Sequence, residues 1–559
     1  MCGHNAICNR SYLASMKRSA ESLANTGGIE CNNAVAASGA GSIIRSDTQV
    51  EDSSEDDISG SFPKGERTYD AMHTWPQHQF SRMIQPWPFV RSQLARHMQF
   101  GVMSTTHYSG WGTFEVTTSV LEKSFVALGL CPTSHAGFKS YAACDNETKC
   151  QHILKNHVGK HAPQHVFCDL CDTVPISIRD RWAMALRRYR FRVNAAVEKI
   201  SDKDAALHTR RQLIANYGDR FVGMALEDLK DLHFSRETQS YCVKHKRLCP
   251  RFPSAQEVGD GLLIDASGTT CVGFSTMGSG WNFLDDSCIP FVLWAWMIAC
   301  IVPNMVVHEC VPGFAVRVLA RILNSRFATF TISSVVFSPT DQGIPVERKR
   351  RYTVCIPECK WKLAAPYDIH NFGVATFRSL VADAQVFKLA SPADLDALNV
   401  IMAEAKYLPP RQFNGKPWPW QMLLSAGARR RLTGIQVFRP VLEGSNVCVV
   451  SISQNPEYNN NLNGIVPSLI KNSFFFFLDS VNAKKDRPAV KQEYLAMQMF
   501  PVKLPPGHMF ADCCSFSGIL DNLAFTSVRE RAGNGMNVAA VGSVLMFVLS
   551  MLIEHDAGR

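Results

Sequence analysis

A single cysteine, Cys271, lies in the segment GTTCVGFSTMGSGW (residues 268–281), where most of its neighbours are small. Free cysteines are often buried as small apolar side chains, so the residue type alone predicts a structural role. The position predicts more, because the strand-like segment GLLIDAS comes directly before it. A thiol on a loop after a strand is a candidate nucleophile for covalent catalysis.

Other loops that follow strand-like segments also carry side chains capable of chemistry. In chain order these loops hold Tyr108, Gly110 and Gly112 in YSGWGTFE, then Asp145, Asp169, Cys271, Glu309 in HECVPGF, and Arg348 and Arg350 in GIPVERKRRY. In parallel α/β sheets, ligands bind outside the carboxyl ends of the strands. Glycines there let the backbone approach a ligand closely, and an acid there typically accepts hydrogen bonds from ribose hydroxyls.

The elements that must position these residues alternate along the chain. Strand-like runs lie at residues 100–108, 137–145, 165–170, 260–267, 304–311, 329–337 and 351–357, with helical patterns between them. Such alternation predicts a parallel α/β sheet. Residues 1–95 are rich in Ser, Gly, Asn and Ala and are predicted to be mostly disordered.

The order of these residues (glycine loop, two acids, Cys, Glu, Arg-x-Arg) resembles the C5-cytosine DNA methyltransferase family over most of residues 100–559. TTCVGFSTMGSGW is similar to the catalytic Pro-Cys loop of that family, and HECVPGF to its Glu-Asn-Val element. DQGIPVERKRRYTVCI is similar to its Gly-Val-Pro-Gln-x-Arg-x-Arg segment. EYLAMQMFP (residues 493–501) and RAGNGMNVAAVG (residues 531–542) resemble its two C-terminal elements.

The resemblance implies a Rossmann-like, S-adenosylmethionine-dependent methyltransferase sheet with an inserted target-recognition domain. The expected domains are a catalytic domain at residues 96–360, with a basic helical insertion at about 173–258, a target-recognition domain at 361–484, and the C-terminal part of the catalytic domain at 485–559. The expected cofactor is S-adenosyl-L-methionine, held by Tyr108, Gly110, Gly112, Asp145, Asp169 and Asn534.

The resemblance also implies the activity, that of a DNA (cytosine-5-)-methyltransferase. Cys271 would attack C6 of cytosine as a thiolate, Glu309 would protonate or hydrogen-bond N3, and Arg350, with Arg348 farther away, would hold the base. A base within double-stranded DNA cannot reach a loop cysteine, so the target cytosine must flip out of the duplex.

Several positions depart from the family pattern: Thr270 replaces the proline, Cys310 the asparagine and Val346 the glutamine. The ribose-binding glutamate of the family falls at Ala143 in one register, which leaves Asp145 as the substitute acid. The asparagine matters most, because the family uses its amide to orient the catalytic loop. Two alternatives therefore stay open. One is a catalytically inactive, DNA-binding or regulatory relative, and the other is a tRNA cytosine-C5 methyltransferase of the same fold.

The composition and charge fit a folded protein that binds a polyanion such as a nucleic acid. The chain has 559 residues, 46% hydrophobic, and a net charge of +9; residues 1–65 carry −3, which leaves +12 on the remainder. The start of the chain lacks a secretory signal pattern, and 19 cysteines then indicate reduced thiols in a nucleus, or a cytoplasm if the source is not eukaryotic. We expect no membrane span, because the apolar runs at 289–307 and 538–553 fit buried helices.

Two groups of possible metal ligands occur in the sequence. Cys168 and Cys171 form a C-x-x-C pair, and Cys242, His245 and Cys249 lie near one another in the chain. A structural zinc site needs four ligands, usually as two matched pairs. Because no second matched pair is evident, the sequence predicts no metal site.

Overall fold

Seven predicted strand-like segments all form strands of one sheet in the computed structural model, which describes residues 62–131, 137–232, 234–270, 272–275, 278–436, 447–454 and 463–555. Among these residues the sheet has nine strands, in the order β5-β4-β3-β2-β1-β6-β7-β9-β8. They are β1 (Val102–His107), β2 (Phe138–Cys144), β3 (His165–Phe167), β4 (Gln239–Cys242), β5 (Arg247–Pro250), β6 (Leu262–Gly268), β7 (Met305–Cys310), β8 (Phe330–Phe337) and β9 (Arg350–Pro357).

Five strands form the parallel centre of the sheet, in the order β3-β2-β1-β6-β7. The strand order reverses between β1 and β6, as in doubly wound nucleotide-binding folds, so the carboxyl ends of both strands open onto one crevice. The sheet is therefore of the Rossmann-like α/β type.

The two margins of the sheet are antiparallel, which corrects the expectation of a wholly parallel sheet. At one margin β9 runs antiparallel to both β7 and β8. At the other margin β4 and β5 form a hairpin that pairs with β3. The sequence analysis did not predict this hairpin, because four-residue strands with exposed side chains show little apolar periodicity.

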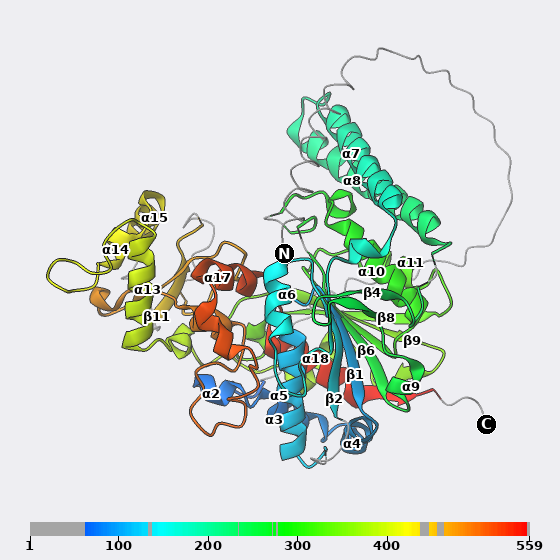
Figure 1. The fold of residues 1–559 in the computed structure, drawn as a ribbon, viewed down its shortest axis with the longest axis horizontal. Helices are drawn as coiled ribbons and strands as arrows, with labels where there is room; N and C mark the ends of the chain where they lie inside the picture. The colour runs from blue at the N-terminus through cyan, green and yellow to red at the C-terminus, as the bar shows by residue number, and fades with distance from the viewer. Residues whose placement is uncertain are drawn as a thin grey trace. The chain divides into compact units, whose positions relative to one another are not determined.

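Helices cover both faces of the sheet (Figure 1). One face packs against α4 (Val90–Phe100), α5 (Thr113–Ala127), α6 (Thr148–Lys155) and α18 (Val538–Met551), and the other against α10 (Cys288–Ile301) and α11 (Val316–Leu323), with α7 (Ile176–Val197) and α8 (Lys203–Leu229) beyond them. Successive strand residues alternate between the layers: Ile264 of β6 joins the first core and Leu263 the second.

The two apolar runs form buried helices, as predicted. All residues of α18 are buried, and so are nearly all residues of α10. A helix that is apolar on every side is typical of a protein core. The continuous stretch Phe525–Met551 is long and apolar enough to cross a membrane by length and composition, yet most of its apolar window is enclosed by protein.

Helical structure begins earlier than the sequence predicted. α2 (Tyr69–Met72), α3 (Trp75–Met83) and most of α4 lie within the segment expected to be mostly disordered. They are tied to the C-terminal part of the chain, for example by the Gln79 side chain, which donates to the Ser543 carbonyl at 2.9 Å. Burial of Trp75 and Phe80 accounts for the order. The rest of that expectation, for residues 1–61, lies outside the described residues.

The predicted insertion and the predicted target-recognition region each contain both helices and strands. In the insertion, α7 and α8 are followed by the β4–β5 hairpin and α9 (Ala255–Val258). Within 361–484, α12 (Ile369–Thr376) packs in the main core, whereas α15 (Ala426–Gln436) packs with β11 (Val447–Ser451) and β12 (Phe475–Asp479) in a separate small core. The remaining α-helices of the described residues are α13 (Pro392–Glu404), α14 (Trp420–Leu423), α16 (Lys491–Met497) and α17 (Phe525–Asn534). Two short pairings complete the strands: β13 (Arg487–Pro488) extends the small sheet, and β10 (Trp361–Leu363) pairs with β14 (Leu552–Glu554).

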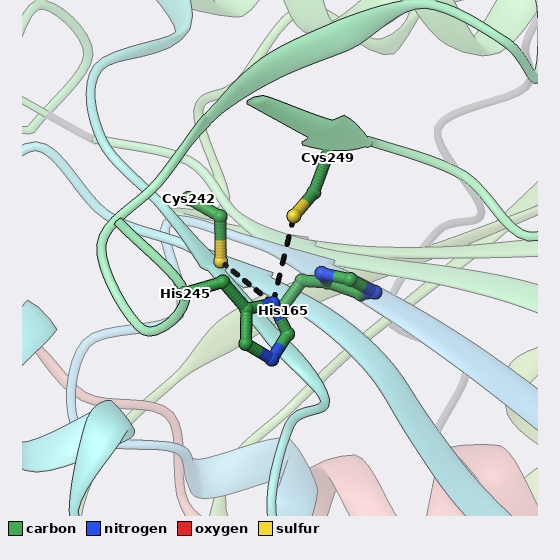
Figure 2. A group of neighbouring side chains, drawn as sticks. All are labelled: His165, Cys242, His245 and Cys249. Atoms are coloured by element: carbon green, nitrogen blue, oxygen red, sulfur yellow. Dashed lines mark hydrogen bonds between the residues drawn. The ribbon is translucent and has the colours of Figure 1, made fainter. Parts of the chain in front are cut away.

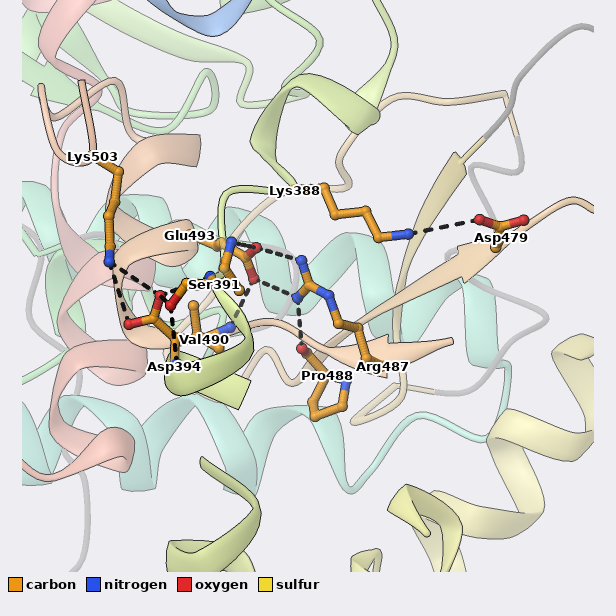
Figure 3. A network of polar contacts seen from close by, with 10 residues as sticks. Lys388, Ser391, Asp394, Asp479, Arg487, Pro488, Val490, Glu493 and Lys503 are labelled. Carbon is orange, nitrogen blue, oxygen red and sulfur yellow. Dashed lines mark hydrogen bonds and ion pairs between the residues drawn. The ribbon is translucent and has the colours of Figure 1, made fainter. Parts of the chain in front are cut away.

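A buried ion pair fastens the small sheet to the C-terminal part of the chain (Figure 3). Arg487 in β13 donates two hydrogen bonds to the Glu493 carboxylate of α16, at 2.8 and 2.6 Å. The backbone amides of Val490 and Ala390 each donate to the same carboxylate at 2.9 Å. Glu493 is fully buried, so all four hydrogen bonds compensate the desolvation of one charged group.

Glu493→Gln should lower the free energy of unfolding by about 3 kcal/mol or more, because it leaves the Arg487 guanidinium buried without a counter-charge. Denaturant midpoints and melting temperatures measure the loss. The matched control is Glu554→Gln, which breaks the exposed 3.1 Å ion pair with Arg96 and should cost less than about 1 kcal/mol. Equal losses in the two variants would contradict a dominant role for the buried pair.

Candidate active site

Glu309 lies near the end of β7, and Gly268 at the end of β6 is its partner in the parallel register. A Cβ atom at Gly268 would lie 3.5 Å from Oε2 of Glu309 and 3.4 Å from Cγ of Met536. The backbone of β6 therefore packs closely against the carboxylate and against Met536. Cys271, the predicted nucleophile, follows Gly268 by three residues but lies outside the described residues, so its distance from Glu309 stays a prediction.

Glu309 forms an ion pair with Arg350, the first residue of β9, with 3.2 Å between Nε and Oε1. Both side chains are largely enclosed, with 7% of the glutamate side chain and 14% of the arginine side chain exposed. Arg350 also donates from Nη1 to the Lys349 carbonyl at 2.8 Å. The structure thus brings together two of the four predicted catalytic residues.

Arg348 points elsewhere. Its side chain is buried, and Nη1 donates to the carbonyls of Leu469 and Gly533 at 3.0 and 3.2 Å. Its backbone amide donates to Oγ of Ser338 at 2.9 Å. These contacts tie three distant segments together, so the geometry supports a positioning role for Arg348 rather than direct contact with a base.

The predicted glycine loop after β1 has the backbone conformation that its residues favour. Gly110 and Gly112 have φ of 58° and 87°, in the left-handed region. At Gly112 a Cβ atom would also lie 2.6 Å from Cε1 of His157, so only glycine fits. Tyr108 has φ of 55°, which is uncommon for a residue with a side chain and is typical of functional sites.

The two predicted acids lie beside this loop. Asp145 follows β2 and accepts hydrogen bonds from the backbone amides of Gly110 and Glu147, each at 2.9 Å. Burial raises the pKa of Asp145 to about 6, although both amide hydrogen bonds lower it. Asp169 follows β3 and accepts from the amide of Cys171 at 2.9 Å.

Tyr108, Asp145 and Asp169 line one hollow, whose empty space of about 250 Å³ includes open solvent. Its other lining residues are Cys144, Asn146, Leu170 and Pro290. The hydroxyl of Tyr108 is buried and has no hydrogen-bond partner among the described residues. A hollow that combines two carboxylates with apolar surfaces fits a nucleoside, whose hydroxyl and amino groups donate hydrogen bonds and whose base is flat.

The last predicted cofactor residue, Asn534, is exposed at the C-terminal end of α17. Three residues later, Asn537 is fully buried and caps α18, where its side chain accepts from the amide of Ala540 at 3.1 Å. The segment between them lies against the glycine loop, because a Cβ atom at Gly535 would lie 3.2 Å from Nε1 of Trp111. The sequence analysis overlooked Asn537, although an asparagine before an apolar helical run is a capping signal.

Sequence reasoning also missed four residues of the hollow, Cys144, Asn146, Leu170 and Pro290, and a buried acid beside the glycine loop. Pro290 lies in the first turn of α10, many residues after the preceding strand in the sequence, so no local sequence signal predicts its place in the hollow. Leu170 directly follows Asp169, so its position could have been inferred. Glu115, in the first turn of α5, accepts from the Thr106 hydroxyl at 2.9 Å, and burial raises its pKa to about 7.

Comparisons with known proteins give structural matches alone. No protein-family model matches the chain, and no curated protein matches it. Solved structures that resemble it include a protein described as a DNA modification methyltransferase encoded within an E. coli prophage (TM-score 0.37, 10% identity, 80% of this chain and 99% of that chain), the S. pombe Dnmt2 methyltransferase (0.34, 13%, 80% and 98%) and the Entamoeba histolytica methyltransferase EhMeth (0.35, 10%, 80% and 98%). At this level of similarity the likeness assigns no activity to this chain.

Glu115→Gln should make the protein more stable at pH 8 and have much less effect at pH 5. The pKa of Glu115 is raised in the folded state, so wild-type stability falls as pH rises from the ordinary glutamate range through about 7. The neutral glutamine removes that loss. Melting temperatures at pH 5, 6, 7 and 8 measure the difference, with the exposed Glu198→Gln as control. An equal gain at both ends of the range would refute this assignment.

Proposed function

We propose that the chain is an S-adenosylmethionine-dependent methyltransferase that transfers a methyl group to C5 of cytosine in DNA, with Cys271 as the nucleophile. One observation carries the proposal: the hollow lined by Tyr108, Asp145 and Asp169 opens at the carboxyl edge of the sheet that also holds the Glu309–Arg350 pair. The loop that contains Cys271 leaves the sheet beside Glu309.

The cofactor would lie in the hollow, with its adenosine part against the glycine loop. The Asp145 carboxylate would accept from the ribose hydroxyls and Asp169 from the adenine amino group, while Leu170 and Pro290 would contact the base. When bound, the cofactor supplies an activated methyl group on a sulfonium. The chain's own contribution is to hold the reacting atoms in line.

The chemistry at cytosine needs groups that act on three atoms of the ring. We propose that the Cys271 thiolate attacks C6, which removes the aromaticity and makes C5 nucleophilic. Glu309 donates a proton or hydrogen bond to N3 as negative charge develops there. Because the carboxyl group must carry a proton to do this, entry of the base would shift Arg350 from Glu309 to the O2 atom. C5 would then take the methyl group from the sulfonium, which leaves S-adenosylhomocysteine. Loss of the C5 proton to solvent water would restore the C5–C6 double bond and release Cys271 as a thiolate.

The partner would be double-stranded DNA with the target base flipped out. On α15, the predicted recognition region exposes Arg429 and Arg430, whereas Nε of Arg431 donates to the Ile452 carbonyl at 2.6 Å. Three of the six arginines of α7 are less available for phosphates, because they form ion pairs. Arg179 pairs with Asp172, Arg181 with Asp228 and Arg190 with Asp286.

The first test traps the covalent adduct. Wild-type protein should form a denaturant-resistant complex with duplex DNA that contains 5-fluorocytosine, because fluorine at C5 prevents release of the cysteine. Cys271→Ala should form none and should lose methyl transfer, and Glu309→Gln should lose at least 100-fold in rate. Both variants should bind S-adenosylhomocysteine within about threefold of wild type, since neither residue lines the hollow.

The exposed Cys359→Ser variant is the control for loss of a thiol. Methyl transfer to tRNA but not to duplex DNA would move the proposal to the RNA alternative. No adduct and no transfer with either substrate, in protein that still binds S-adenosylhomocysteine, would favour the inactive relative.

The second test measures the affinity for S-adenosylhomocysteine by calorimetry between pH 5 and 8. Burial raises the pKa of Asp145 to about 6, and the carboxylate form is the acceptor for ribose hydroxyls. Affinity should therefore rise as pH rises through 6, and Asp145→Asn should flatten this rise and weaken binding about tenfold at pH 8. The exposed Asp260→Asn should behave as wild type. A wild-type affinity that does not change with pH would refute the contact.

A further inference from the structure

Four side chains, one from β3 and three from the β4–β5 hairpin, gather at this margin of the sheet (Figure 2). They are His165, Cys242, His245 and Cys249, and their candidate ligand atoms all lie within 4.8 Å of one another. Both cysteines are buried, His165 is half-buried and His245 is exposed. Two sulfurs and two imidazoles form the donor set that zinc takes in structural sites.

The two sulfur–nitrogen distances at His245 fit a tetrahedral ion. With Zn–S near 2.3 Å and Zn–N near 2.0 Å, a tetrahedral site separates sulfur from nitrogen by about 3.5 Å. Nδ1 of His245 lies 3.6 Å from Sγ of Cys242 and 3.5 Å from Sγ of Cys249. The ring of His165 lies across the cluster, with its centroid 4.9 Å from that of His245 and the two planes at 80°.

The backbone holds three of the ligands in place. Cys242 ends β4 and Cys249 lies in β5, so the hairpin sets the two sulfurs on neighbouring strands. The turn between them carries His245 and is closed by the amide of Lys246, which has φ of 57° and donates to the Cys242 carbonyl at 2.7 Å. The hairpin meets β3 where Cys242 pairs with Phe167, two residues after His165.

His165 provides the independent sign of a missing ligand. Its Nδ1 atom is buried and has no hydrogen-bond partner among the described residues. A buried imidazole nitrogen without a partner is costly, and a bound metal ion would supply the missing partner. The rings of Tyr141 and Phe167 lie next to it, with centroids at 4.9 and 6.0 Å.

We propose that His165, Cys242, His245 and Cys249 bind one structural Zn²⁺ ion. Binding would release the two thiol protons, so the two thiolates balance the charge of the ion. Four protein ligands leave no open position for water, so the site would be structural rather than catalytic. The ion would pin the β4–β5 hairpin to β3, the strand that leads into the Asp169 loop. This proposal replaces the expectation of no metal and is independent of the proposed function.

The test is the metal content of the full-length chain, purified without chelators and freed of any affinity tag. Mass spectrometry of the metals should find about one zinc per chain. His245→Ala, which removes an exposed ligand and should fold, and Cys249→Ser should each reduce the zinc content or affinity at least tenfold. Cobalt substitution should give the visible absorption of a tetrahedral ion with thiolate ligands, and both variants should lose it.

The control is Cys359→Ser, which removes an exposed thiol outside the cluster and should keep the zinc. Removing zinc from wild type with a chelator should lower the melting temperature and speed amide exchange in residues 239–250. Wild type that neither contains zinc nor binds added zinc would overturn the proposal. So would zinc that remains in both ligand variants, or a Cys242–Cys249 disulfide found by peptide mapping.

Discussion

The antiparallel entry of β9 beside β7 is the constraint on which the candidate catalytic pair depends. Because β9 runs antiparallel to β7, the start of β9 lies beside the end of β7. This places Arg350 near Glu309. No loop geometry is needed to bring the charges together. Insertion of one reversed strand therefore brings a cation to a sheet edge that otherwise carries carboxylates.

The reversal of strand order between β1 and β6 provides the second half of the site, and a buried polar network holds these two strands together. Asp265 of β6 is fully buried and accepts from Thr105 at 2.6 Å and from Nε1 of Trp294 at 2.8 Å, and His107 lies 2.9 Å away. The strands thus stay fixed relative to each other and to α10 at the crevice. The hollow and the Glu309–Arg350 pair can act on one substrate only if the strand ends that carry them keep a fixed spacing.

The sequence predicted the features that a single strand determines, and it missed the features that arise only when several strands pair. Long apolar runs such as residues 304–311 showed β7, and position after a strand identified Asp145, Asp169 and Glu309. The short β4–β5 hairpin lacked a periodic signal. The sequence did not group His165 with Cys242 as a proposed zinc ligand, because the two residues lie far apart in the chain. Only the pairing of β3 with β4 brings them together. Ligand spacing in sequence fails when ligands come from different strands.

Two positions that differ from the pattern of the C5-cytosine DNA methyltransferase family, Thr270 and Cys310, lie where the loop that contains Cys271 leaves the sheet. Cys310 is buried at the end of β7 and offers no amide to the loop. His308, however, directly precedes Glu309, and its Nε2 atom lies 2.7 Å from the hydroxyl of Thr269. Thr269 lies two residues before Cys271 in the sequence. Burial lowers the pKa of His308 to about 3, so the ring is neutral and can accept this hydrogen bond near neutral pH. Thr269, at the start of the loop that contains Cys271, is thus tied to β7 by a hydrogen bond that needs no asparagine at position 310.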